Sequence, residues 1–233
     1  MSTSTNGVRF TLDGEAIEAR PGETILQAAR RHGTAIPHLC YADGMRADGN
    51  CRACVVEIEG ERTLAPSCAR TPAPDMKVHS RSERALHSQK MVLELLLSDM
   101  PETAYRQDSE LDYWAAHLDV GEPRFPHRCQ PEPDLSHPAI AVRLDACIQC
   151  TRCVRACREV QVNDVIGYAH RGAHAQIVFD MDDPMGQSTC VACGECVQAC
   201  PTGALMPAGV AAELTPTQAT SPSEWYGPLR AGA

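Results

Sequence analysis

Aromatic side chains and long apolar runs are both scarce in this chain of 233 residues. Phe, Trp and Tyr together make up only 4% of the sequence. The longest apolar stretch lies within residues 91–97, MVLELLL, and a transmembrane helix needs about 20 residues. Residues 1–7 lack the charged start and the apolar segment of a signal peptide. These absences predict small hydrophobic cores, no membrane span and a cytoplasmic protein.

Basic residues and catalytic motifs are lacking as well. The sequence has 21 Lys and Arg against 30 Asp and Glu, a formal net charge of −9, whereas a protein that binds nucleic acid needs a dense basic surface. Nucleophile-elbow, phosphate-loop and dinucleotide-binding motifs are missing from the sequence. We therefore expect no nucleic-acid partner and no catalytic residue in this chain.

Cysteine, in contrast, is abundant. Of the 13 cysteines, 12 fall into three groups of four. The odd total and the missing signal peptide argue against a disulfide framework. The spacing within each group fits the ligation of an iron–sulfur cluster. An iron–sulfur cluster held by four thiolates has no open iron site for a substrate, so its natural role is to accept one electron and pass it on. The groups are Cys40, Cys51, Cys54 and Cys68; Cys147, Cys150, Cys153 and Cys157; and Cys190, Cys193, Cys196 and Cys200.

Two of these groups repeat the motif CxxCxxCxxxC. The sequences CIQCTRCVRAC (147–157) and CVACGECVQAC (190–200) have all four cysteine pairs offset by 43 residues. In ferredoxins with two 4Fe-4S clusters, the fourth cysteine of each motif ligates the other cluster, whereas zinc uses two separated CxxC pairs. We therefore assign Cys147, Cys150, Cys153 and Cys200 to a first 4Fe-4S cluster, and Cys190, Cys193, Cys196 and Cys157 to a second.

The remaining group of cysteines is a weaker signal. Cys40, Cys51, Cys54 and Cys68 are separated by ten, two and thirteen residues, whereas plant-type 2Fe-2S ferredoxins have gaps of four and two before a distant fourth cysteine. Four cysteines on loops could also hold zinc. The glycines of the loop DGMRADGNCRAC let backbone amides approach sulfur, and together with the surrounding strands they favour a 2Fe-2S cluster.

The N-terminal third predicts a β-grasp ferredoxin domain. Residues 8–20 alternate as two strands around a turn at Asp13 and Gly14. A short helix capped by Thr24 follows, and VVEIEGERTLA (55–65) predicts another hairpin. Strand, strand, helix and hairpin in this order are the layout of a β-grasp domain.

The middle of the chain predicts a connection between modules. Leu86, Met91 and Leu95 recur on one stripe of a helix expected over residues 82–99. The polar, proline-rich segment that follows holds one helical candidate, at residues 111–118.

The predicted fold class is α+β, with two cluster modules. A hairpin is expected between the cubane motifs, at residues 171–184. Because the cores are small, we expect cluster ligation to supply much of the folding energy. The expected domains are a β-grasp 2Fe-2S domain (1–80), a connecting helix and bridging segment without a cluster (81–137), a two-cluster 4Fe-4S ferredoxin-like domain (138–208) and an extended C-terminal tail (209–233).

A few residues stand apart from these motifs. Arg158 follows Cys157 where the motif usually has proline, and it either raises the potential of a nearby cluster or forms a surface ion pair. Cys129 has no partner at ligand spacing, so we interpret it as an ordinary thiol. The nine histidines show no metal-binding spacing.

These motifs resemble a known family. IPHLCYADGMRADGNCRACVVEIEGERTLAPSC, MVLELLLSD and the two cubane motifs resemble the N-terminal electron-transfer region of the α subunit of cytoplasmic, NAD-dependent formate dehydrogenases that contain molybdenum or tungsten. The resemblance covers about residues 8–207, and VRACREVQVNDVIG favours this family. The chain is more distantly similar to the large iron–sulfur subunit of respiratory complex I and to the accessory domains of iron-only and NAD-reducing hydrogenases.

The sequence departs from this family at two places. The family usually carries a His and three cysteines for an additional 4Fe-4S cluster, and Met100, Ala104, Gln107 and Tyr113 stand at those positions here. None of them ligates iron in the usual way, so we expect three clusters and not four. The family also continues into a molybdopterin-binding catalytic domain, whereas this sequence stops at Ala233. Either the catalytic part is a separate subunit, as we expect, or the chain is a fragment.

The resemblance implies an electron-transfer subunit between two partners. One is a molybdopterin catalytic subunit that oxidises formate, and the other is a flavin-containing NAD diaphorase. Alternatives are the diaphorase arm of an NAD-reducing hydrogenase, a stand-alone multi-cluster ferredoxin and a zinc-bound scaffold. Co-purifying metal distinguishes the formate dehydrogenase from the hydrogenase, and absent iron would indicate the zinc-bound scaffold.

Overall fold

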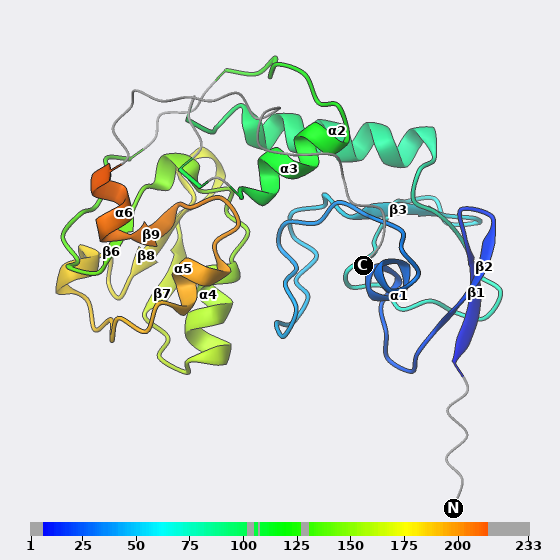
Figure 1. The fold of residues 1–233 in the computed structure, drawn as a ribbon, viewed down its shortest axis with the longest axis horizontal. Helices are drawn as coiled ribbons and strands as arrows, with labels where there is room; N and C mark the ends of the chain where they lie inside the picture. The colour runs from blue at the N-terminus through cyan, green and yellow to red at the C-terminus, as the bar shows by residue number, and fades with distance from the viewer. Residues whose placement is uncertain (1–6, 102–104, 107, 127–130, 214–233) are drawn as a thin grey trace, which may run out of the picture. The chain divides into compact units, whose positions relative to one another are not determined.

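The protein is described by a computed structural model covering residues 7–101, 105, 106, 108–126 and 131–213. Two compact units divide these residues (Figure 1). Residues 7–41 and 47–93 form the first unit, and residues 42–46 and 94–213 form the second. Both units mix short strands with helices.

A five-stranded sheet in the order β2-β1-β5-β3-β4 organises the first unit (Figure 1). β1 pairs antiparallel with β2 and parallel with β5, and β3 pairs antiparallel with both β5 and β4. The strands are β1 (Val8–Leu12), β2 (Glu15–Ala19), β3 (Val55–Ile58), β4 (Ala65–Pro66) and β5 (Lys77–His79).

Both predicted hairpins of this unit are confirmed. Between β1 and β2, Asp13 and Gly14 have φ values of 49° and 90°, as the two central residues of a type I′ turn require. The second hairpin pairs Val56 with Ala65. The turn that the sequence suggests at Glu59 and Gly60 is present, because the Glu61 N–H donates a hydrogen bond to the Ile58 carbonyl oxygen over 3.0 Å, although β4 begins only at Ala65.

α1 (Ile25–Arg31) begins where the sequence predicts, directly after its cap Thr24. Thr24 Oγ1 accepts a hydrogen bond from the Gln27 N–H, and Gln27 Oε1 accepts one from the Thr24 N–H, which completes a capping box. Gly33, with a φ of 81°, follows the last turn. The apolar face of α1 joins the strands in a core that also includes Cys54 and Cys68. Two of the candidate cluster ligands, Cys54 and Cys68, are therefore part of the hydrophobic core of the unit.

α2 (Glu83–Leu97) confirms the predicted connecting helix but corrects its buried face. Ala85, Gln89 and Leu93 are buried, whereas Leu95 is 46% exposed. Gln89 Nε2 donates hydrogen bonds to the carbonyl oxygens of Val55 (2.8 Å) and Ser80 (3.3 Å). A polar side chain thus occupies the centre of the buried line, and the leucine-based prediction was wrong there.

The second unit is built from short elements around the two cubane motifs. β6, before the first motif, pairs antiparallel with β9, after the second. β7 and β8 form a hairpin between the motifs as predicted, but β7 lies wholly before the expected range of 171–184. The elements are α3 (Glu110–His117), β6 (Ile140–Val142), α4 (Arg152–Arg155), a π-helical turn (Ala156–Val160), β7 (Ile166–Ala169), β8 (Gln176–Phe179), α5 (Glu195–Ala199), β9 (Leu205–Pro207), α6 (Ala208–Glu213), and 3₁₀ turns at Leu144–Ala146, Gly172–His174 and Met185–Gln187.

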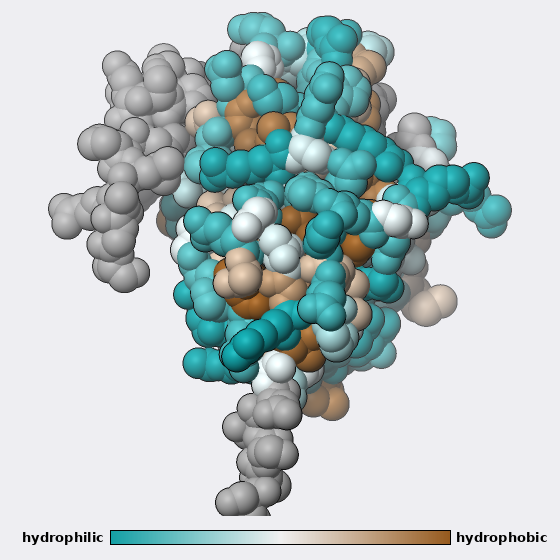
Figure 2. Space-filling view, turned by 90° about the vertical axis from the view of Figure 1, so that its right-hand side faces the viewer, coloured by the Kyte–Doolittle hydropathy of each residue, from teal (hydrophilic) through white to brown (hydrophobic). Residues whose placement is uncertain are grey.

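The surface viewed from the right-hand side of Figure 1 is mainly hydrophilic, with small apolar areas between polar side chains (Figure 2). Over the described part of the chain, we find no helix with the length and apolar character needed to cross a bilayer.

α3 confirms the helical candidate expected at residues 111–118. The segment expected to be an extended tail begins with α6, and its residues from 214 onward lie outside the described ranges.

Candidate iron–sulfur sites

The first group of cysteines lies on two loops beside the core of the first unit. Cys40, Cys51 and Cys54 belong to the loop between α1 and β3, and Cys68 follows β4. Cys40, Cys54 and Cys68 are fully buried, whereas Cys51 is partly exposed. Arg52 has a φ of 61°, a left-handed conformation that non-glycine residues seldom adopt. This conformation lets the chain turn sharply between Cys51 and Cys54.

The thiols of this group lie close enough to change one another's protonation. The Cys40 N–H donates a hydrogen bond to Cys51 Sγ over 3.4 Å. Hydrogen bonds from the thiols of Cys51 and then Cys68 lower the pKa of Cys40 to about 2. A hydrogen bond from Cys68 lowers the pKa of Cys54 to about 7, while the donors Cys51 and Cys68 have raised pKa values. The fit to a cluster therefore rests on four sulfur donors lying close together, which iron would bind as thiolates.

A cavity in the second unit brings four cysteines of the two motifs together. Cys147, Cys150 and Cys153 line it with Cys200, which comes from the end of the other motif. Apolar side chains, including Ile148, Ile177 and Leu205, complete the wall. Four sulfur donors around an apolar cavity fit the chemistry of a 4Fe-4S cluster.

Burial dominates the protonation of the thiols in this cavity. It raises the pKa of Cys150, and the nearby Cys200 adds to this effect, while the Arg152 N–H and guanidinium lower it. Burial also raises the pKa of Cys153, followed by repulsion from Cys150 and Cys147. A thiolate here needs compensating positive charge, which iron supplies when bound.

The last group of cysteines gathers around Cys196, in α5. Burial raises the pKa of Cys196 to about 12, and repulsion from Cys190, Cys193 and Cys157 contributes to this. Cys157 lies in the π-helical turn that continues α4, so this group also takes one member from the other motif. Cys157 and Cys196 are buried, whereas Cys193 is exposed.

The backbone repeats along with the cysteines. Gln149 and Thr151 in the first motif have φ values of 54° and 59°. Ala192 and Gly194, 43 residues later, have φ values of 57° and 82°. Left-handed residues at matching positions give both loops the same sharp turns before their helices. The internal repeat of the sequence is therefore also a repeat of structure.

Over the described residues, neither the cysteines nor the other metal-binding residue types form a site for one metal ion. Within the described ranges, no three His, Cys, Asp or Glu side chains are arranged to hold a single metal ion. His137 is buried, and its Nδ1 accepts hydrogen bonds from the N–H groups of Ala139 and Ile140, a structural role. His127 and Cys129 lie outside the described residues.

Arg158 forms a surface ion pair. Its Nε lies 2.6 Å from Asp164 Oδ1, and the two side chains are 56% and 59% exposed. Of the two roles considered for this residue, the structure contains the ion pair. Exposed pairs of this kind are worth about 1 kcal/mol or less, because water screens them.

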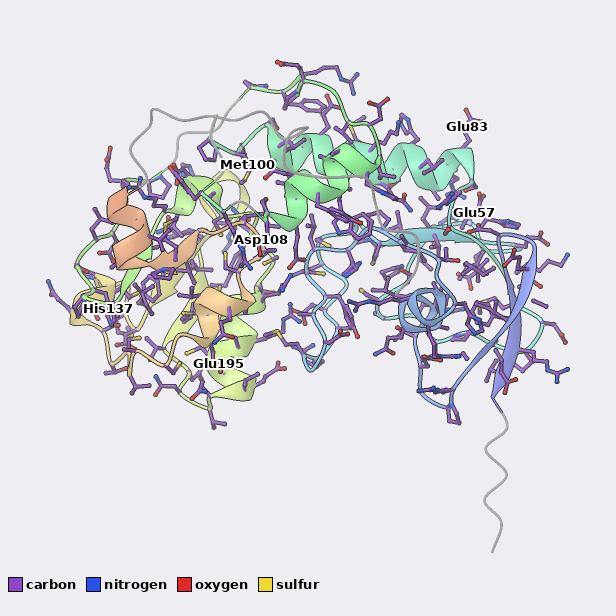
Figure 3. All side chains as sticks on the ribbon, in the orientation of Figure 1. Glu57, Glu83, Met100, Asp108, His137 and Glu195 are labelled. Atoms are coloured by element: carbon purple, nitrogen blue, oxygen red, sulfur yellow. The ribbon has the colours of Figure 1, made fainter. Side chains whose placement is uncertain are left out.

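Sequence reasoning missed the contacts of the segment between α2 and α3. Arg106 Nη1 donates a hydrogen bond to the carbonyl oxygen of Cys200 over 2.7 Å. Glu110, the first residue of α3, forms an ion pair with Arg152 at 2.7 Å. Figure 3 labels Met100 and Asp108 in this segment. No periodicity or motif in the proline-rich sequence marks these contacts.

The same segment contains the positions where the resembling family has additional ligands. Met100 is buried, and Tyr113 packs its ring against Trp114 and His117 in α3. Ala104 and Gln107 lie outside the described residues. The two described side chains are thus engaged in packing.

Comparisons with known families match both units. A family described as "2Fe-2S iron-sulfur cluster binding domain" matches residues 5–83. A second, described as "NADH-quinone oxidoreductase subunit 3, ferredoxin-like domain", matches residues 137–206. Each match contains the cysteines assigned above to the corresponding cluster type.

Individual relatives extend over most of this chain. It is 37% identical over 208 residues to the NADP-reducing hydrogenase subunit HndD of Solidesulfovibrio fructosivorans, covering 84% of this chain and 35% of that protein. It is 34% identical to the G 2 subunit of the NADH-quinone oxidoreductase of Rhizobium meliloti, covering 85% and 24%. It is 28% identical to "Putative formate dehydrogenase SH0748" of Staphylococcus haemolyticus, covering 84% and 20%. The chain thus spans about a third or less of these proteins.

A solved structure is similar over nearly its whole chain. A chain in the crystal structure of an NAD+-reducing [NiFe]-hydrogenase in the H2-reduced state superposes with a TM-score of 0.80 at 28% identity. The match covers 94% of this chain and 99% of that one. The protein therefore carries a 2Fe-2S domain and a 4Fe-4S ferredoxin-like domain, the iron–sulfur electron-transfer domains found in NAD(P)-linked oxidoreductase complexes.

Proposed function

We propose that this chain relays electrons through three clusters. The observation that carries the proposal is the cavity lined by Cys147, Cys150 and Cys153 of one motif and by Cys200 of the other. The first unit would be a β-grasp 2Fe-2S domain. The proposed ligands are Cys40, Cys51, Cys54 and Cys68 for the 2Fe-2S cluster, Cys147, Cys150, Cys153 and Cys200 for one 4Fe-4S cluster, and Cys190, Cys193, Cys196 and Cys157 for the other.

The chain's own residues supply binding and insulation. Such clusters, when bound, take up and release one electron at a time. Burial of Cys40, Cys54 and Cys68 excludes water from the 2Fe-2S site, and the apolar wall of the cavity does the same for the first 4Fe-4S site. The exposed Cys193 leaves the second 4Fe-4S site more accessible.

We further propose that formate is the source of the electrons. Oxidation of formate to CO2 releases two electrons and one proton, and NAD+ takes up both electrons with one proton. A molybdopterin subunit with molybdenum or tungsten would perform the first reaction, and a flavin-containing diaphorase would perform the second. The resemblance of residues 154–167 and the 28% identity to a protein named as a formate dehydrogenase support this proposal.

Hydrogen is the second candidate donor. The hydrogenase chain of known structure is matched over 99% of its length, whereas the named formate dehydrogenase is matched over only 20%. This correspondence of length favours the diaphorase arm of an NAD-reducing hydrogenase.

Purification of the native complex would distinguish these functions. Iron, sulfide, molybdenum, tungsten and nickel would be quantified, and NAD+ reduction would be assayed with formate and with H2. Molybdenum or tungsten together with formate-dependent activity would support the first proposal, and nickel together with H2-dependent activity would support the second. Iron and sulfide below the content of three clusters per chain would refute the relay. Substitution of a proposed ligand by serine should lower the iron content of the chain, whereas Cys129→Ser, at a cysteine outside the proposed ligand sets, is the control and should leave the iron content unchanged.

A further inference from the structure

The first 4Fe-4S site is bordered by arginines held in fixed positions. Arg106 donates a hydrogen bond to the Cys200 carbonyl at 2.7 Å, and Arg155 donates one to the Cys150 carbonyl at 3.3 Å. A Cβ atom at Gly203 would lie 3.0 Å from Arg106 Cβ, so the glycine leaves room for this close approach. Guanidinium groups therefore contact the backbone of ligands from both motifs.

Arg152 lies between the ligands Cys150 and Cys153 in the sequence. Its side chain is only 8% exposed, and Nη1 is 2.7 Å from both carboxylate oxygens of Glu110. The Glu110 N–H in turn donates to the Pro201 carbonyl over 2.9 Å. The first residue of α3 thus contacts Arg152, which lies between two candidate ligands of the first motif, and Pro201, which follows the candidate ligand Cys200.

We propose that Arg106 and Arg152 raise the reduction potential of the first 4Fe-4S cluster. Reduction adds one negative charge to a cluster, and a nearby positive charge stabilises the reduced state most where water is excluded. The inference rests on the ligation proposed above for Cys147, Cys150, Cys153 and Cys200. It gives the segment between α2 and α3 a role in tuning a cluster, in a region where the resembling family holds an additional one.

Each arginine has an acidic partner, and this makes the sign of the effect testable. Arg152 pairs with Glu110, and Arg106 pairs with Asp108 at 2.5 Å and 2.9 Å. Removing the guanidinium leaves a net negative charge near the cluster, whereas removing the carboxylate leaves a net positive one. Substitution of the two partners should therefore shift the same potential in opposite directions.

The test is an EPR-monitored redox titration of the full chain with all clusters reconstituted. Arg152→Gln should lower the reduction potential of one 4Fe-4S cluster by about 59 mV, which corresponds to about a tenfold change in the equilibrium constant of a one-electron reduction. Glu110→Gln should raise that same potential. Arg106→Gln should lower it by less, because the Arg106 side chain is 34% exposed. Arg158→Gln, which removes an exposed and paired arginine, should leave both potentials unchanged.

The outcomes separate this inference from the proposed function. If the wild-type chain shows no 4Fe-4S signals, the proposed function itself fails. If the signals are present but Arg152→Gln and Glu110→Gln shift the potential in the same direction, or not at all, the tuning role is wrong and the relay stands. If Arg152→Gln fails to retain its iron, Arg106→Gln and Glu110→Gln decide by the same criterion of opposite shifts.

Discussion

Gln89 should be a major contributor to the stability of the first unit. It is 1% exposed, and its amide bridges the carbonyl oxygens of Val55 in β3 and Ser80 after β5. Val55 directly follows the candidate ligand Cys54. Gln89→Met keeps the length of the side chain and removes both hydrogen bonds.

The expected loss is about 2–4 kcal/mol. Each hydrogen bond contributes about 1 kcal/mol net, and each carbonyl left unpaired in the interior adds a desolvation penalty. The apolar gain of methionine offsets part of this loss. With a denaturant slope (m-value) of about 2 kcal/mol per molar of urea, within the usual range for small proteins, the unfolding midpoint should fall by roughly 1–2 M.

Urea titration of the cluster-loaded protein measures this effect. The visible absorbance of the 2Fe-2S cluster reports on the first unit, and circular dichroism reports on the whole chain. Lys90→Met, at the exposed neighbouring position of α2, is the matched control and should leave the midpoint almost unchanged. Equal midpoints for the two variants would refute the argument that the bridge between β3 and Ser80 stabilises the unit.

Three further predictions concern ligation, pH and cluster removal. Cys157→Ser and Cys193→Ser should perturb one 4Fe-4S EPR signal, and Cys200→Ser and Cys150→Ser the other; grouping by motif instead would contradict the exchange of fourth ligands. The bidentate Arg124 guanidinium holds the pKa of Glu94 at about 2, below the value of about 4.3 for an unfolded chain. The ion pair therefore contributes its full stabilisation above the pKa of Glu94 in the unfolded chain, and this stabilisation is lost as the pH falls through the pKa in the folded chain. Arg124→Gln should accordingly lower the melting temperature equally at about pH 6 and about pH 8. A decrease at only one of these pH values would count against this argument. Chelation of iron should abolish the hydrogen-exchange protection of backbone amides in α4 and α5, because these helices have four and five residues and are too short to persist alone. The amides of β1, β2 and α1 should stay protected. Protected amides in α5 of the iron-free protein would show that this helix does not depend on a cluster.

Local rules predicted the elements whose ends depend on single residues. The turn at Asp13 and Gly14 and the cap at Thr24 follow from backbone preferences and from one side-chain oxygen. The parallel pairing of Thr11 with Lys77 depends on distant parts of the sequence, and no local pattern encodes it. Periodicity predicted α2 but not its buried face, since Gln89 is buried for its hydrogen bonds and not for its hydrophobicity.

The candidate sites divide in the same way. Cysteine spacing identified the candidate ligands, because four thiolates around a small cluster need close positions in the sequence; their ligation of iron stays a prediction. The arginines near the first 4Fe-4S site could not be predicted. Arg106 approaches the Cys200 carbonyl only because the chain returns to this point after folding, and the surrounding sequence carries no signal of it.

The shared cavity of Cys147 and Cys200 also constrains how the protein is made. During translation, the first three cysteines of this site emerge well before the fourth. Iron and sulfide delivered in that interval would meet an incomplete set of thiolates, with one corner of the cubane open to oxygen. If Cys147, Cys150, Cys153 and Cys200 ligate one cluster as proposed, the complete site is available only after residue 200 has left the ribosome. On the proposed ligation, each 4Fe-4S site draws a ligand from both sides of a hairpin, and the strands that flank the two motifs, β6 and β9, pair with each other in the folded chain.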